Sequence, residues 1–197
     1  METTTKKHLN NLNNTDKVLR YVSFQHIMKL TDQPVDWAYE VWDGLLILLK
    51  EGDNHQRTMA VQLLSNLTKS DPQQRMLIDF ERLMSVTKDE KFVTARHSLQ
   101  ALWKIGIVSE TCRNKVIEAL SKRFEECSTE KNGTLIRYDI IEVFRKMYDE
   151  VEDEKLRDTA VALIETEDDA KYRKKYSAIW KDILKGQKIN FNIQGVT

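Results

Sequence analysis

Three arginines in this chain are each followed seven residues later by a large aromatic side chain. A guanidinium presents a fork of N–H donors that fits carboxylates and phosphates, and an aromatic ring can stack on a ligand or fill a core. Seven residues make nearly two helical turns, so each arginine lies on the same helix face as its ring. We expect the rings to pack and the arginines to bond carboxylates and carbonyls of neighbouring turns. The pairs are Arg96 with Trp103, Arg137 with Phe144, and Arg173 with Trp180.

These anchors recur along the chain at the spacing of a helical-repeat protein. Stepping back from Arg96 leads first to Thr58, with Arg57 beside it, and then to Arg20. The anchor positions 20, 58, 96, 137 and 173 are 38, 38, 41 and 36 residues apart. Such a period predicts stacked two-helix units, each covering the next and leaving one long face for a partner.

The elements that would position the anchors are helices. Only 6 Gly and 2 Pro are present, and apolar residues recur at helical spacing between short polar turns. We predict an all-α chain of about nine helices and no sheet, with a flexible tail at 1–14, a repeat domain at 15–186 and a second tail at 187–197. The expected helices cover 15–30, 34–51, 53–69, 72–86, 88–106, 109–127, 133–149, 152–166 and 169–186.

The pairing of these helices resembles the HEAT repeat over residues 15–186. That family places an Asp in the turn within each repeat and an Arg early in the second helix, and Asp169 with Arg173 matches this best. Asp53 with Arg57 approximates the pattern, whereas the segment before Arg137 lacks the Asp. Asp89 with Arg96 approximates it as well. The resemblance implies a right-handed α-α superhelix of 4–5 helical pairs whose second helices line a concave side.

Charge is distributed unequally between the two sets of helices. The predicted first helices sum to −6 and the second helices to +7, although the whole chain has a net charge of zero. A basic concave face and an acidic back would select an acidic partner. The candidate partner-binding residues on that face are Arg96, Arg137, Arg173, Lys174, Lys175 and Lys181.

Motifs for catalysis, metal or cofactor binding are missing from the sequence. It has no Gly-rich phosphate loop, nucleophile elbow or paired histidines, and its histidines are scattered. We therefore expect no catalytic residue, metal or cofactor. Cys112 and Cys127 fit buried thiols in a reducing compartment. No signal peptide or apolar run of membrane-spanning length is present, so the expected location is the cytoplasm.

Two functions follow from this reading. The first is a non-enzymatic scaffold that binds a protein or an acidic peptide along the basic face. The alternative is a nucleic-acid function, because the chain also resembles the HEAT-like alkylpurine DNA glycosylases in size, helical pairs and basic groove. That resemblance implies a lesion site at Trp103, Asp139 and Trp180, with the anchor arginines on phosphates.

Overall fold

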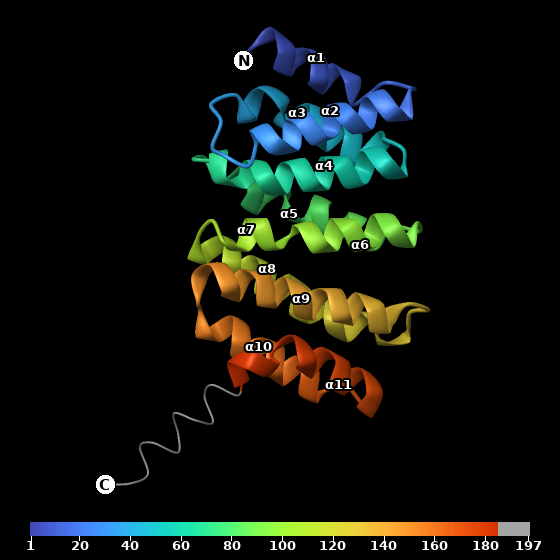
Figure 1. Ribbon diagram of the computed structural model, residues 1–197, viewed down its shortest axis with the longest axis vertical. Coiled ribbons are helices and arrows are strands. Elements are labelled where there is room, and N and C mark those ends of the chain that lie inside the picture. The colour runs from blue at the N-terminus through green and yellow to red at the C-terminus, as the bar shows by residue number, and fades with distance from the viewer. Residues whose placement is uncertain (185–197) are drawn as a thin grey trace, which may run out of the picture. The chain divides into compact units, whose positions relative to one another are not determined.

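The computed structural model describes residues 1–184, and these residues form helices and turns with no strand. This confirms the all-α class. Figure 1 labels the helices. Their bounds are α1 Thr3–Asn11, α2 Lys17–Leu30, α3 Ala38–Glu51, α4 Asn54–Leu67, η1 Thr68–Ser70, α5 Arg75–Val86, α6 Phe92–Ala101, α7 Trp103–Gly106, α8 Glu110–Glu126, η2 Cys127–Thr129, α9 Gly133–Val151, α10 Glu154–Glu165 and α11 Ala170–Ile179.

The predicted count of nine helices is too low, since the described residues contain eleven α-helices. The segment expected to be a tail at 1–14 contains α1, which packs on α2 and buries Thr5 and Leu12. The helix expected at 88–106 is divided into α6 and α7 at Leu102. The Leu102 amide donates to the Leu99 carbonyl, and the Ile105 amide donates to the Leu102 carbonyl, so the backbone is wound more tightly here than in an α-helix. The expected tail at 187–197 and the expected helix end at Gly186 lie outside the described residues.

Aspartate side chains cap the starts of four described helices, α2, α4, α10 and α11. Asp53 forms a capping box with Gln56 at the start of α4, and Asp169 accepts from the Lys171 amide at the start of α11. The start predicted at Pro72 is wrong. The helix begins at Arg75 instead, since Gln74 adopts a left-handed conformation with φ 56°.

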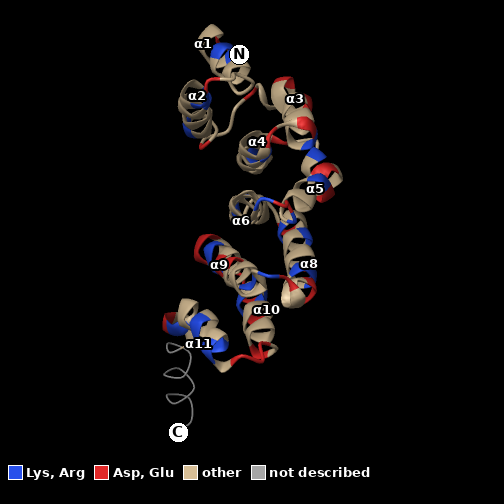
Figure 2. Ribbon diagram, turned by 90° about the vertical axis from the view of Figure 1, so that its right-hand side faces the viewer, with Lys and Arg blue, Asp and Glu red and all other residues tan. Residues whose placement is uncertain are grey.

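The described residues fold into two compact units that meet in sequence between Val116 and Ile117, so α8 begins in the first unit and ends in the second. In the first unit, α2, α4 and α6 pack side by side in one layer, and α3 contacts α5 in another (Figure 2). Helix α4 contacts helices of both layers, and from Thr58 to Leu67 every residue except Gln62 is buried. The buried Trp42 indole donates to Asp79 at 2.9 Å and ties α3 to α5.

The second unit is built on α9, which contacts both α10 and α11. Phe144 of α9 is fully buried, and so are Tyr176 of α11 and Trp180, which follows it. Trp180 packs edge-on against Tyr148 with ring centroids 5.4 Å apart. The prediction that the recurring aromatics pack is thereby confirmed for Phe144 and Trp180.

Candidate binding surface

The anchor arginines of the first unit join consecutive turns. Arg20 donates to Asp53 at 2.8 Å. Arg57 donates through Nε to Asp89 at 2.6 Å and through a terminal nitrogen to the Gly52 carbonyl at 2.9 Å. Because of this contact with Arg57, the pKa of Asp89 is lowered despite its burial. These arginines therefore hold turns together, which is the structural role expected of the anchors.

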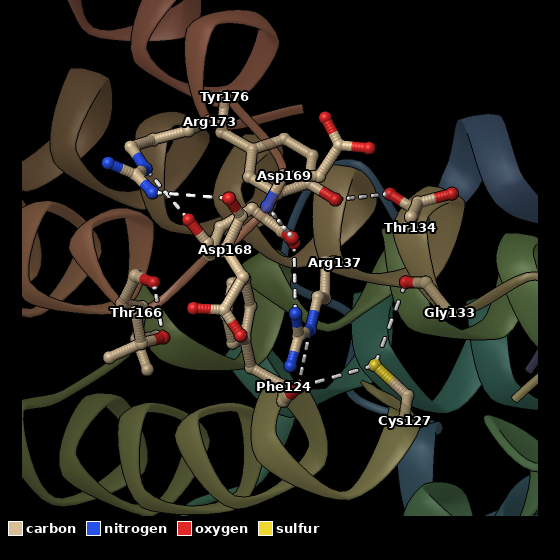
Figure 3. Close-up of polar contacts among 12 residues, drawn as sticks. Phe124, Cys127, Gly133, Thr134, Arg137, Thr166, Asp168, Asp169, Arg173 and Tyr176 are labelled. Atoms are coloured by element: carbon tan, nitrogen blue, oxygen red, sulfur yellow. Dashed lines mark hydrogen bonds and ion pairs between the residues drawn. The ribbon is translucent and has the colours of Figure 1, made fainter. Parts of the chain in front are cut away.

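The second unit repeats this arrangement around Arg137, which donates through Nε to the Phe124 carbonyl and through a terminal nitrogen to Glu167, both at 2.9 Å. Arg173 donates to the carbonyls of Glu167 at 2.7 Å and Asp168 at 3.3 Å. Figure 3 shows both guanidinium groups turned toward these backbone groups. Arg137 and Arg173 were predicted to bind a partner; each uses two nitrogens of its guanidinium within the unit, and Arg173 is nevertheless exposed.

The repeat register differs from the predicted one at Arg96. Arg20 and Arg57 each donate to an aspartate of a later turn, and the two arginines are 37 residues apart in the sequence. A further step of 37 residues leads to Thr94. Thr94 donates its hydroxyl to the Asn54 carbonyl at 3.1 Å, so a short side chain replaces an anchor arginine. Arg96 lies two residues on, half-buried, with its guanidinium 5.7 Å from the Phe92 ring centroid.

The residues predicted for a DNA-lesion site do not form one exposed cluster. Asp139 and Trp180 are both 0% exposed and belong to the second unit, whereas the half-buried Trp103 belongs to the first. A fully buried ring offers no face on which a base could stack. The three lysines predicted to bind a partner, Lys174, Lys175 and Lys181, are all exposed and therefore accessible to one.

Two adjoining hollows lie between α4 and α6 in the first unit, and His97 lines both. The first has a volume of about 460 Å³ and is lined in part by His55, Lys91 and Phe92. The second has a volume of about 270 Å³ and is lined in part by Lys104. Among the described residues lining these two hollows there is no Asp or Glu. We call the residues of both hollows the α4–α6 face.

Lys104 is the most constrained cation of the α4–α6 face. Its ammonium lies 2.5 Å from the side-chain oxygen of Asn66 and 3.9 Å from a carboxylate oxygen of Asp32. Burial lowers the pKa of Lys104, and the nearby charge of Lys69 lowers it further, against the opposing effect of Asp32. A lysine with this combination of cavity, fixed partner and shifted pKa is a functional-site candidate.

Sequence reasoning missed this cluster. One available signal was Asn66 itself, an amide side chain among the leucines of Leu63–Leu67, and in the structure it is completely buried. A buried amide must be hydrogen-bonded, and its Nδ2 donates to the Thr31 hydroxyl at 3.1 Å and the Met28 carbonyl at 3.2 Å. Asn66 thus links α2 and α4 to the lysine that follows α6.

The opposite layer of the first unit carries a larger groove with a different charge pattern. Its volume is about 770 Å³, and α3 and α5 supply most of its lining. Its charged lining residues are Asp43, Lys50, Glu51, Arg57, Arg82 and Asp89. Three carboxylates balance three cations there, so this groove differs in charge from the hollows of the α4–α6 face.

Within residues 1–184 no group of three or more His, Cys, Asp and Glu side chains is arranged to hold a metal ion. No helix in the same range has the length and apolar character needed to cross a membrane. Comparison with known proteins adds no identification, since no family model and no curated protein matches the chain. The geometry and charge of the α4–α6 face make it the candidate site.

Proposed function

We propose that this protein is a non-enzymatic interaction module that binds an acidic protein segment or peptide on the α4–α6 face. The observation that carries the proposal is the contrast between the two layers of the first unit. The hollows on one layer are lined by Lys91, Lys104 and two histidines without a carboxylate, whereas the groove on the other is charge-balanced. Complementary charge favours acidic partners over basic ones.

The proposal includes a HEAT-like architecture, that is, helical pairs repeated in a right-handed α-α superhelix. Its support is the repeated role of arginine, since Arg57 and Arg137 each bond a carbonyl of an earlier turn and an acid of a later one. We also place the protein in the cytoplasm. Cys112 and Cys127 are buried free thiols, which suits a reducing compartment.

A DNA-binding function has weaker support. Asp139 and Trp180 are inaccessible, and Arg137 and Arg173 already bond groups within the protein. Binding to duplex DNA would be strongly weakened by salt, because it depends on phosphate contacts that release counterions. We keep duplex DNA as an outcome of the test below.

The test compares fluorescent synthetic peptides of matched length, one acidic, one basic and one neutral, together with a short DNA duplex. Fluorescence anisotropy measures their binding to the wild type and to two double variants, one on each layer of the first unit. The first is Lys91→Glu/His97→Glu on the α4–α6 face. The matched control is Lys50→Glu/Ser85→Glu, which alters the groove between α3 and α5.

We expect the acidic peptide to bind the wild type and the control variant, and to bind Lys91→Glu/His97→Glu at least tenfold more weakly, about 1.4 kcal/mol. Equal loss in both variants, or preference for the duplex, would overturn the proposal. A further variant, Lys174→Glu/Lys175→Glu, tests the exposed lysines of the second unit by themselves. We expect this variant to bind the acidic peptide with the affinity of the wild type.

A further inference from the structure

The two hollows of the α4–α6 face differ in chemistry. The first is bounded in part by the Phe92 ring and the side chains of Val93 and Thr58. Val93 is 64% exposed, so this hollow offers the apolar surface of Val93 and Phe92 to a partner beside its polar lining residues. The second hollow contains Lys104 with the amide of Gln62. One hollow thus suits an apolar side chain and the other an anionic one.

The Lys104 ammonium is held in position before any partner arrives. Asn66 accepts from it at 2.5 Å, and Asn66 is itself fixed by donating to Thr31 and to the Met28 carbonyl. The Lys104 side chain is 23% exposed, so the head group is partly removed from water. A partly desolvated ammonium gains more from a carboxylate than a fully hydrated one does, because the effective dielectric constant is lower.

The distance between the hollows follows from the helix that lines both. Val93 marks the first and Gln100 the second, seven residues further along the helix. At 1.5 Å per residue this separation is about 10 Å. A peptide in the polyproline II conformation rises about 3.1 Å per residue with three residues per turn, so its side chains three positions apart lie on the same side and span about 9 Å.

The amide side chain of Gln62 in the second hollow favours an extended peptide over a helical one. Gln62 donates to the Thr58 carbonyl at 3.3 Å, and a glutamine amide has further donor and acceptor capacity. An extended peptide presents backbone N–H and C=O groups that can use this capacity. A helix satisfies those groups internally and presents none.

We propose, on the basis of the function above, that the α4–α6 face binds an extended peptide, in the polyproline II conformation, with an apolar residue three positions from an acidic one. The apolar side chain occupies the hollow at Phe92 and Val93. The acidic side chain occupies the hollow at Lys104 and accepts a charge-assisted hydrogen bond from its ammonium.

The experiment uses acidic peptides of constant composition in which a leucine and a glutamate are separated by one, two or three intervening residues, in both chain directions. A second set replaces that glutamate with glutamine. The protein variant is Lys104→Gln, which retains an N–H donor for Asn66 but loses the charge. Its control is Lys69→Gln, since Lys69 donates to the Asp32 carbonyl and does not line either hollow.

We expect the peptide with two intervening residues, in one direction, to bind best and to prefer glutamate to glutamine by about tenfold. Lys104→Gln should reduce that preference to less than about twofold, and Lys69→Gln should keep it, with circular dichroism showing that both variants are folded. Acidic peptides that bind equally at every spacing, with Lys104→Gln retaining the preference, would overturn this inference and leave the proposed function standing. If no acidic peptide binds the α4–α6 face, the proposed function itself fails.

Discussion

Arg137 and Glu167 form the pair on which the structural role of the anchor arginines can be tested most sharply. Their side chains are 13% and 6% exposed, and the Arg137 guanidinium also lies 4.6 Å from the Phe124 ring centroid. Removing one member of a buried ion pair leaves the other charge without its partner. We therefore expect Arg137→Met to lower the free energy of unfolding by about 3–5 kcal/mol.

The partner substitution completes a double-mutant cycle. Glu167→Gln keeps an oxygen acceptor but loses the charge, so we expect a smaller cost of about 2–3 kcal/mol. The double variant should cost less than the sum of the two, with a coupling free energy of about 1.5–3 kcal/mol. The control cycle is Lys122→Met/Glu126→Gln, an exposed pair 3.9 Å apart, for which we expect a coupling of about 0–1 kcal/mol.

Urea unfolding followed by circular dichroism gives these free energies. Because the chain has two compact units, hydrogen exchange across α9 then assigns the loss to the second unit. A coupling in the buried pair no larger than in the exposed pair would show that Arg137 and Glu167 do not stabilise the second unit as an ion pair. So would an Arg137→Met variant of wild-type stability that had lost peptide binding, because Arg137 would then act on a partner.

Three further predictions concern the backbone and pH. Gly133→Ala should destabilise the protein by more than about 2 kcal/mol in thermal unfolding, because the new Cβ would overlap the Cys127 carbonyl oxygen. Gly44→Ala should instead stabilise it by about 0.5–1 kcal/mol in the same assay, because Gly44 is inside α3 with nothing within 4 Å of a new Cβ. The His8 ring stacks on His26 at 4.0 Å, and burial, followed by the charge of His26, lowers the pKa of His8 below 6.5. The folded state therefore favours neutral His8, so its stabilising contribution is present above pH 6.5 and is lost as pH falls through the lowered pKa. Hydrogen exchange in α1 should consequently accelerate at acidic pH, and a His8→Gln variant should lose most of that acceleration.

Most of the helices could be predicted from local features of the sequence. Acidic caps such as Asp53 and Asp169 mark helix starts within a few residues, and the apolar spacing identified Phe144 as buried. Helix α1 was missed because long-range polar contacts hold it. One is the His8 ring bonded to the Ser23 hydroxyl at 3.1 Å.

The candidate site was harder to predict than the fold, since it depends on pairs of residues from different helices. Asn66 and Lys104 are separated by 38 positions, and neither is unusual within its own helix except for the burial of the asparagine. The position of the third anchor residue was also mispredicted, because it too depends on a contact between helices. Arg96 matched the sequence period, whereas Thr94 makes the contact between helices at that level.

The most direct test of the α4–α6 face is hydrogen exchange of the whole protein with and without the best-binding acidic peptide. We predict slower exchange in Asn54–Leu67 and Phe92–Ala101, with no change in Ala38–Glu51 or Arg75–Val86. Protection of α3 and α5 instead, or saturating peptide that protects neither pair of helices, would contradict this prediction.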